Sequence, residues 1–147
     1  MKELFELIKN NSKYNFYTVK QETIYKTEKD MGIIIPDTLK QFYLNVGYGF
    51  LETGSYNINR IMGPSSIEEF YLGTGQFENS EEVEIYSKYT KDKLVFFEVN
   101  ESLFLSIGIT IRNRDKIFYY DKEIANDISD FLKQYLENEK YFLDKEI

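Results

Sequence analysis

The side chains that most often carry out enzyme chemistry are missing from this sequence. It contains no cysteine and no histidine, which removes thiolate nucleophiles, disulfides, zinc–thiolate sites and the commonest general base. Its 25 Asp and Glu residues could supply a glycosidase pair, but a single sequence does not bring two carboxylates to the separation that such a pair needs. We therefore predict no catalytic residues, no cofactor site and no metal site. An enzyme that uses carboxylates and tyrosines is kept as an alternative.

The acidic residues are unevenly spread along the chain. It has 25 Asp and Glu against 18 Lys and Arg, a net charge of −7, and residues 61–87 contain no basic residue. Complementary charge speeds encounter and rejects wrong partners, so this stretch predicts a surface for a basic protein; the alternative is that the charge only maintains solubility. Because no basic run is present, direct nucleic-acid binding is not expected. The predicted partner-binding residues are Glu68, Glu69, Glu78, Glu81, Glu82, Glu84 and Tyr86.

Aromatic residues make up 17% of the chain, and three of them, Phe118, Tyr119 and Tyr120, are consecutive. Such a cluster could stack on the bases of single-stranded nucleic acid. Successive side chains on a strand point to opposite faces, however, so at least one of the three must face away from the other two. We therefore interpret the cluster as core or protein interface, where tyrosine offers a large contact area at low entropic cost. This favours a binding module.

The element that best organises the chain is a short helix within residues 33–51. Pro36 suits the first position of a helix because its φ is fixed and it lacks an N–H group. Gly47 follows the last apolar position, where a left-handed cap favours glycine, and Gly49 lets the backbone turn again. The apolar residues at helical spacing, which we expect to be buried, are Leu39, Phe42, Tyr43 and Val46.

This stretch resembles the signature of the SUKH superfamily. The family includes bacterial immunity proteins of polymorphic toxin systems and fungal Knr-type regulators of cell-wall synthesis. Many members have Asn-Gly-Gly at the end of the helix. This chain instead has Val46-Gly47-Tyr48-Gly49, in which the second glycine is displaced by one residue. The likeness covers about residues 15–138. The residues that match the family signature, and that are expected to be structural, are Ile35, Pro36, Leu39, Phe42, Gly47 and Gly49.

The remaining patterns predict helices before and after a group of strands. A capping box formed by Thr18 and Gln21 predicts a helix over residues 19–31 with Glu28 facing outward. Further predicted elements are a helix over residues 2–10, a helix starting near Ser80, strands near residues 56–62, 94–99, 103–111 and 116–120, and a helix over residues 123–138. We predict a single α+β domain, residues 1–147, with a central antiparallel sheet and N-terminal and C-terminal helices packed on it.

The resemblance implies a non-enzymatic protein-binding module, an immunity protein (antitoxin) that binds and neutralises a cognate toxin. The acidic stretch suits a basic toxin domain of the nuclease type, and the alternative is a Knr-like regulatory scaffold for a signalling or cell-wall protein. No apolar run is long enough for a membrane helix, and the N-terminal residues lack a signal-peptide layout. We therefore predict a cytoplasmic protein without membrane contact, as a monomer or weak homodimer.

Overall fold

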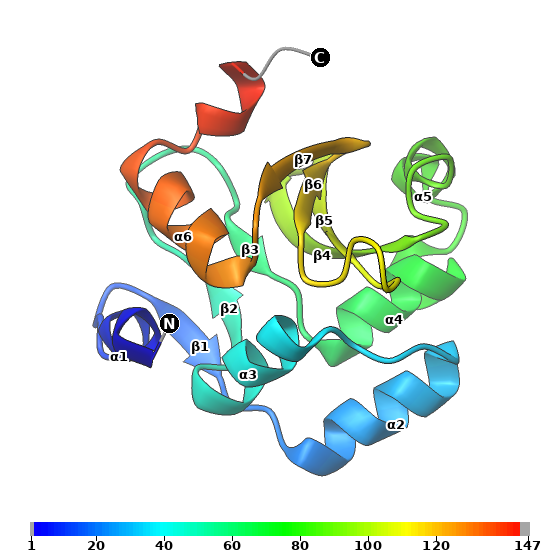
Figure 1. Ribbon diagram of the computed structural model, residues 1–147, viewed down its shortest axis with the longest axis horizontal. Coiled ribbons are helices and arrows are strands. Elements are labelled where there is room, and N and C mark those ends of the chain that lie inside the picture. The colour runs from blue at the N-terminus through cyan, green and yellow to red at the C-terminus, as the bar shows by residue number, and fades with distance from the viewer. Residues whose placement is uncertain (1, 145–147) are drawn as a thin grey trace.

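The structure, a computed structural model, describes residues 2–144 and is built on one antiparallel sheet (Figure 1). Each strand pairs with the next one in the sequence, so the seven strands of the described chain form a meander. The strands are β1 (Asn15–Tyr17), β2 (Tyr48–Phe50), β3 (Arg60–Ile61), β4 (Lys93–Asn100), β5 (Leu103–Gly108), β6 (Ile117–Tyr119) and β7 (Lys122–Ala125). The predicted α+β class with a central antiparallel sheet is confirmed. The predicted domain also includes Met1 and residues 145–147, which lie outside the described residues.

Helices cover both faces of the sheet. They are α1 (Lys2–Lys9), α2 (Gln21–Met31), α3 (Asp37–Asn45), α4 (Pro64–Leu72), α5 (Glu81–Tyr86) and α6 (Ile128–Glu137), with short 3₁₀ turns at Gly75–Phe77 and Tyr141–Asp144. Phe104 lies opposite Glu98 in the β4–β5 pair, so it is on the other face from Phe97. Phe97 packs on Phe131 of α6, whereas Phe104 packs on Phe70 of α4. Figure 1 shows α6 and α5 on opposite sides of the sheet.

The organising helix is α3, and its predicted buried face is confirmed. Pro36 precedes the helix at the N-cap rather than occupying its first turn. The Phe42 ring makes edge-to-face contacts with Phe5 of α1 and Phe16 of β1, with ring centroids 5.2 and 5.8 Å apart. The Tyr43 hydroxyl donates a hydrogen bond to the Met62 carbonyl, and burial raises the pKa of this hydroxyl. The side chains of Leu39, Phe42, Tyr43 and Val46 are all buried. The helix therefore joins α1, β1 and the end of β3 in one core.

Two glycines after α3 allow β1 to lie close to β2. Gly47 has φ +118°, as expected from its place after the helix, and a Cβ atom added there would lie 2.0 Å from the Tyr17 carbonyl oxygen. Gly49 has φ +152°, and its added Cβ would lie 2.0 Å from the Asn15 carbonyl oxygen. Both positions therefore require glycine for space as well as for backbone conformation.

The start of α2 and the role of Glu28 differ from expectation. The capping box of Thr18 and Gln21 is not formed, because the chain leaves β1 in an extended conformation and α2 begins only at Gln21, after an N-cap residue without a side-chain hydrogen bond. Glu28 does not face outward. Its carboxylate is buried, accepts a hydrogen bond from the Ile35 N–H at 2.8 Å and pairs with Lys40 Nζ at 2.8 Å. It thereby fixes the segment that leads into α3.

Two further segments were assigned incorrectly from the sequence. A helix was predicted over residues 123–138, but its first residues form the edge strand β7. Helix α6 begins at Ile128, and the side chain of its N-cap residue Asp127 accepts a hydrogen bond from the Asp130 N–H. The predicted strand over residues 56–62 is reduced to the two residues of β3, since Asn59 before it has φ +55° and interrupts the extended backbone.

The loop between β2 and β3 is held by one carboxylate from the C-terminal end of the chain. Glu139 Oε1 accepts hydrogen bonds from Ser55 Oγ at 2.9 Å, Asn57 Nδ2 at 3.4 Å and Asn59 Nδ2 at 2.7 Å. The Tyr135 hydroxyl of α6 donates to Asn59 Oδ1. Burial alone would raise the pKa of Glu139, but the hydrogen bonds donated to its carboxylate outweigh this and lower the pKa.

We expect Glu139→Gln to lower the free energy of unfolding at pH 7 by about 1 kcal/mol, since charged hydrogen bonds become neutral ones. A carboxyl group whose pKa is lowered by folding stabilises the fold above its ordinary pKa and loses this contribution as pH falls through the lowered value. The deficit of the variant should therefore shrink on acidification. Urea unfolding of the variant and the wild type at pH 7 and at pH 3 measures this loss of stability. Glu137→Gln, at an exposed position, is the control. A loss that is equal at both pH values would contradict the role given to the Glu139 carboxylate.

Candidate protein-binding surface

The structure divides the predicted acidic residues into exposed and engaged groups. Glu78, Glu81 and Glu84 are exposed, and we call these three residues the acidic ridge. The three residues are close together in the sequence: Glu78 precedes the N-cap residue Ser80, whose side chain accepts the Val83 N–H, and Glu81 and Glu84 lie in α5. None of the three forms an ion pair within the residues that the structure describes. Their charge is therefore available to a partner.

The other three acidic residues are used inside the molecule. Glu68 of α4 lies half-buried beside α2, and burial together with the neighbouring Asp30 carboxylate raises its pKa. The Glu69 carboxylate fills the space beside Gly75, where an added Cβ would lie 2.0 Å from Glu69 Oε2. Glu82 accepts a hydrogen bond from Ser80 Oγ at 3.2 Å. These three carboxylates interact with neighbouring groups of the same chain, so we leave them out of the acidic ridge.

Tyr86 does not lie on the predicted surface. Its side chain is 2% exposed, because α5 turns this residue toward β5. The hydroxyl accepts the Phe104 N–H at 2.8 Å, and the ring stacks on Tyr120 with centroids 5.0 Å apart. Burial also raises the pKa of the hydroxyl. We therefore remove Tyr86 from the partner-binding residues and assign it to the core.

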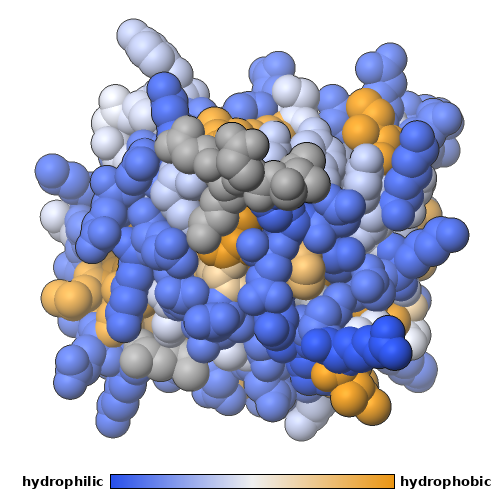
Figure 2. Space-filling model, turned by 45° about the horizontal axis from the view of Figure 1, so that its top comes forward, coloured by the Kyte–Doolittle hydropathy of each residue, from blue (hydrophilic) through white to orange (hydrophobic). Residues whose placement is uncertain are grey.

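An apolar residue that the sequence reasoning missed lies beside two residues of the acidic ridge. Ile85 is 52% exposed and lines a shallow groove with Glu81, Glu84 and Lys88. Helical spacing could have identified it, because Val83 and Tyr86 define the inner face of α5 and Ile85 falls outside that face. Figure 2 shows a mainly hydrophilic face on which apolar residues form separate patches. At the groove, a partner would meet the Ile85 side chain beside the charged groups of Glu81, Glu84 and Lys88.

The aromatic cluster at residues 118–120 is used within the fold. Phe118 is buried, and the Lys93 ammonium group lies 4.7 Å from its ring centroid. Tyr119 packs on Phe142 with centroids 5.0 Å apart, and Tyr120 stacks on Tyr86. The cluster was predicted to serve as core or protein interface, and the structure shows it packed within the fold. Phe118 is buried against the Lys93 ammonium group, and the half-buried Tyr119 and Tyr120 pack on other rings of the same chain.

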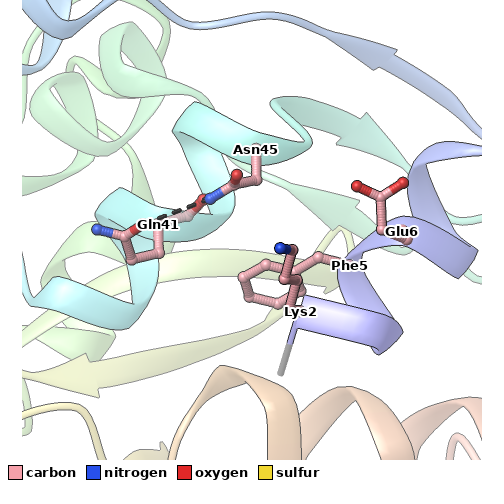
Figure 3. Close-up of a pocket in the computed structure, with 5 residues that line it drawn as sticks. All are labelled: Lys2, Phe5, Glu6, Gln41 and Asn45. Atoms are coloured by element: carbon pink, nitrogen blue, oxygen red, sulfur yellow. Dashed lines mark hydrogen bonds between the residues drawn. The ribbon is translucent and has the colours of Figure 1, made fainter.

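A pocket of about 310 Å³ lies between α1 and α3 (Figure 3). Phe5 is surrounded there by Lys2 and Glu6 of α1 and by Gln41 and Asn45 of α3, and Asn45 Nδ2 donates to the Gln41 carbonyl at 2.7 Å. The polar side chains that line the pocket lie at the surface, and they are one cation, one carboxylate and two amides. They do not include a nucleophile in contact with a base. Within residues 2–144, no cluster of three or more carboxylates could hold a metal ion, and no helix is long and apolar enough to cross a membrane.

Comparison with known proteins gives a consistent family assignment. The family model described as SMI1 / KNR4 family (SUKH-1) matches residues 18–134. The protein named Immunity protein YxxD of Bacillus subtilis (strain 168) is 41% identical over 140 residues, and the alignment covers 95% of each chain. No solved structure matches the chain significantly. The matched residues include α2 to β7 and most of α6.

Proposed function

This chain belongs to the SMI1/KNR4 family (SUKH-1), and from that premise we propose that it is an immunity protein that binds a cognate toxin and neutralises it. The name of its Bacillus relative supports this role. The family resemblance and the lack of histidine and cysteine favour binding, rather than catalysis, as the way in which it acts.

The acidic ridge is the structural observation that supports a binding site. Glu78, Glu81 and Glu84 present their charges to solvent, and Ile85 offers an apolar contact beside Glu81 and Glu84. A toxin domain that acts on nucleic acid needs a basic surface to hold phosphates. We propose that this basic surface is the target of the ridge, and that its occlusion prevents the toxin from reaching its substrate. A nuclease-type toxin would place this encounter in the cytoplasm.

The proposal can be tested in two steps: the reading frames beside the gene for this chain are searched for a toxin, and the toxin found there is expressed in growing cells. Co-expression of the chain should restore growth, and co-expression of a chain with a disrupted core should not. Unrestored growth with well-folded chain present would contradict the immunity function. It would favour the regulatory scaffold that the family resemblance also implies.

The ridge should act mainly on the rate of association. We expect that changing Glu78, Glu81 and Glu84 to Lys will slow association with the toxin by at least about tenfold at low salt, because long-range attraction becomes repulsion. The effect should shrink as the Debye length falls from about 30 Å at 0.01 M to about 8 Å at 0.15 M salt. Stopped-flow mixing measures both quantities.

A matched control separates the ridge from net charge. Glu22, Glu101 and Glu137 are exposed on other elements, and their change to Lys alters the charge of the chain by the same amount. If the control variant slows association as much as the ridge variant does, the ridge residues act only through the net charge of the whole protein. If neither variant changes the rate, the acidic stretch serves solubility alone.

A further inference from the structure

The β5–β6 loop, residues 109–116, places an aliphatic side chain in solvent directly before two cationic residues; we call it the Ile111 loop. Ile111 is 95% exposed, and its neighbours Arg112 and Arg114 are also exposed. A single exposed aliphatic residue is common on protein surfaces and needs no explanation by itself. The surroundings of Ile111 are what distinguish it.

The loop is held rigidly by a buried asparagine. Asn113 Oδ1 accepts the Thr110 N–H at 3.0 Å and the Thr110 hydroxyl at 2.7 Å, and its Nδ2 donates to the carbonyl and carboxylate oxygens of Asp92 at 3.1 and 3.2 Å. The Ile109 N–H also donates to the Asp92 carbonyl at 3.1 Å. At Gly108, an added Cβ would lie 2.0 Å from the Asn113 carbonyl oxygen. These hydrogen bonds therefore hold the tip of the loop against Asp92, the residue just before β4.

The other end of the loop is fastened to α3. Asp115 Oδ1 accepts hydrogen bonds from the N–H and the hydroxyl of Thr38, both at 3.0 Å. Asp115 has φ +72°, a conformation that costs energy outside glycine and persists only where surrounding contacts hold it. Both ends of the loop are therefore fixed, so a partner that binds its tip has little loop entropy to remove.

The tip carries uncompensated positive charge on an otherwise acidic protein. Neither Arg112 nor Arg114 forms an ion pair with any residue in the range 2–144, and Lys91, one residue before Asp92, is also exposed. The nearby carboxylates are engaged, since Asp92 pairs with Lys93 and Asp115 accepts the Thr38 donors. Guanidinium groups bind carboxylates in a two-pronged geometry and are enriched among residues that dominate binding energy.

We propose that the Ile111 loop is a second docking point for the toxin, at which Ile111 enters an apolar recess while Arg112 and Arg114 pair with toxin carboxylates. This inference rests on the proposed immunity function and deepens it. The acidic ridge and the Ile111 loop carry opposite charges, so on this proposal the ridge binds a basic region of the toxin and the loop binds an acidic region. Two contacts of opposite sign select one partner more strictly than one charged surface, because a wrong partner places like charges together.

The test is equilibrium binding of the purified toxin domain encoded beside the gene for this chain. We expect Ile111→Ser, and separately the pair Arg112→Glu and Arg114→Glu, to raise Kd by at least about tenfold. Leu7, which is 71% exposed on α1, provides a matched aliphatic control as Leu7→Ser. The exposed Lys13 and Lys133 provide the charge control as a double change to Glu. Both controls should stay within about twofold of the wild type, and thermal unfolding of every variant confirms that it is folded.

The outcomes separate this inference from the proposed function. If the loop variants bind like the wild type while the ridge variant binds more weakly, the second docking point is wrong and the immunity function stands. If the controls weaken binding as much as the loop variants, the effect is not local and the inference is also wrong. If the wild type does not bind this toxin, both proposals fail.

Discussion

Replacing Phe42 with Ala is expected to lower the free energy of unfolding by about 3–5 kcal/mol, the range for a large buried aromatic side chain. The Phe42 ring is completely buried between α1 and β1. Its loss leaves a cavity beside Phe5 and Phe16 that neither ring can fill without moving its own helix or strand. Urea unfolding of the variant and the wild type at one temperature measures the difference.

The control for Phe42 is another aromatic residue on the same chain. The Tyr56 side chain is fully exposed in the loop between β2 and β3, so Tyr56→Ala should change stability by no more than about 0.5 kcal/mol. If Phe42→Ala costs less than about 1 kcal/mol, or if the two variants cost the same, α3 would not be the helix around which the core is built.

Gly47→Val should strongly lower the free energy of unfolding. Valine is β-branched and disfavoured at the φ of +118° found here, and its Cβ would meet the Tyr17 carbonyl oxygen at 2.0 Å. Relief requires β1 to move away from β2, which breaks their pairing at Tyr17 and Tyr48. Backbone strain of about 1–3 kcal/mol and overpacking of a similar size add to each other.

Gly54 separates the two causes of this effect. It also has positive φ, +82°, but an added Cβ there would meet nothing within 4 Å. Gly54→Val should therefore suffer only the strain, and Gly47→Val should exceed it by at least about 2 kcal/mol in urea unfolding. Equal losses would show that the close approach of β1 to Gly47 contributes nothing to stability.

The parts of the fold that were predictable are those encoded by local patterns. The spacing of Leu39, Phe42 and Tyr43 identifies the buried face of α3 because helical periodicity follows directly from sequence. The start of α5 at Ser80 was predicted for the same kind of reason, since an N-cap acts on residues within one turn. The long apolar runs of β4 and β5 identify strands that are buried on both faces.

The missed elements depend on partners that are distant in sequence. β1 contains three residues and is fixed by pairing with Tyr48–Phe50, about thirty residues later, so no local period marks it. β7 was assigned to the following helix because Ile124 and Ile128 are also compatible with helical spacing. Glu28 was placed outward because nothing in the local sequence shows that its carboxylate binds the Ile35 N–H.

The candidate site was only partly predictable from sequence. Charge composition identified the stretch that holds the ridge, but it could not separate exposed Glu81 from Glu69, which packs against a loop. Tyr86 was placed on the surface because tyrosine is common at interfaces, whereas the side of a short helix that faces the sheet is decided by packing. Ile111 carries no sequence signal, because its proposed docking role depends on the hydrogen bonds that Asn113 and Asp115 make to hold its loop.

The central claim, that this chain neutralises a toxin by binding it, is tested most directly by titration of toxin activity. The purified toxin encoded beside the gene is held at a concentration well above the expected Kd, and the chain is added in steps. We expect activity to fall in proportion to the added chain and to vanish near one equivalent. Full toxin activity in the presence of excess folded chain would contradict the claim.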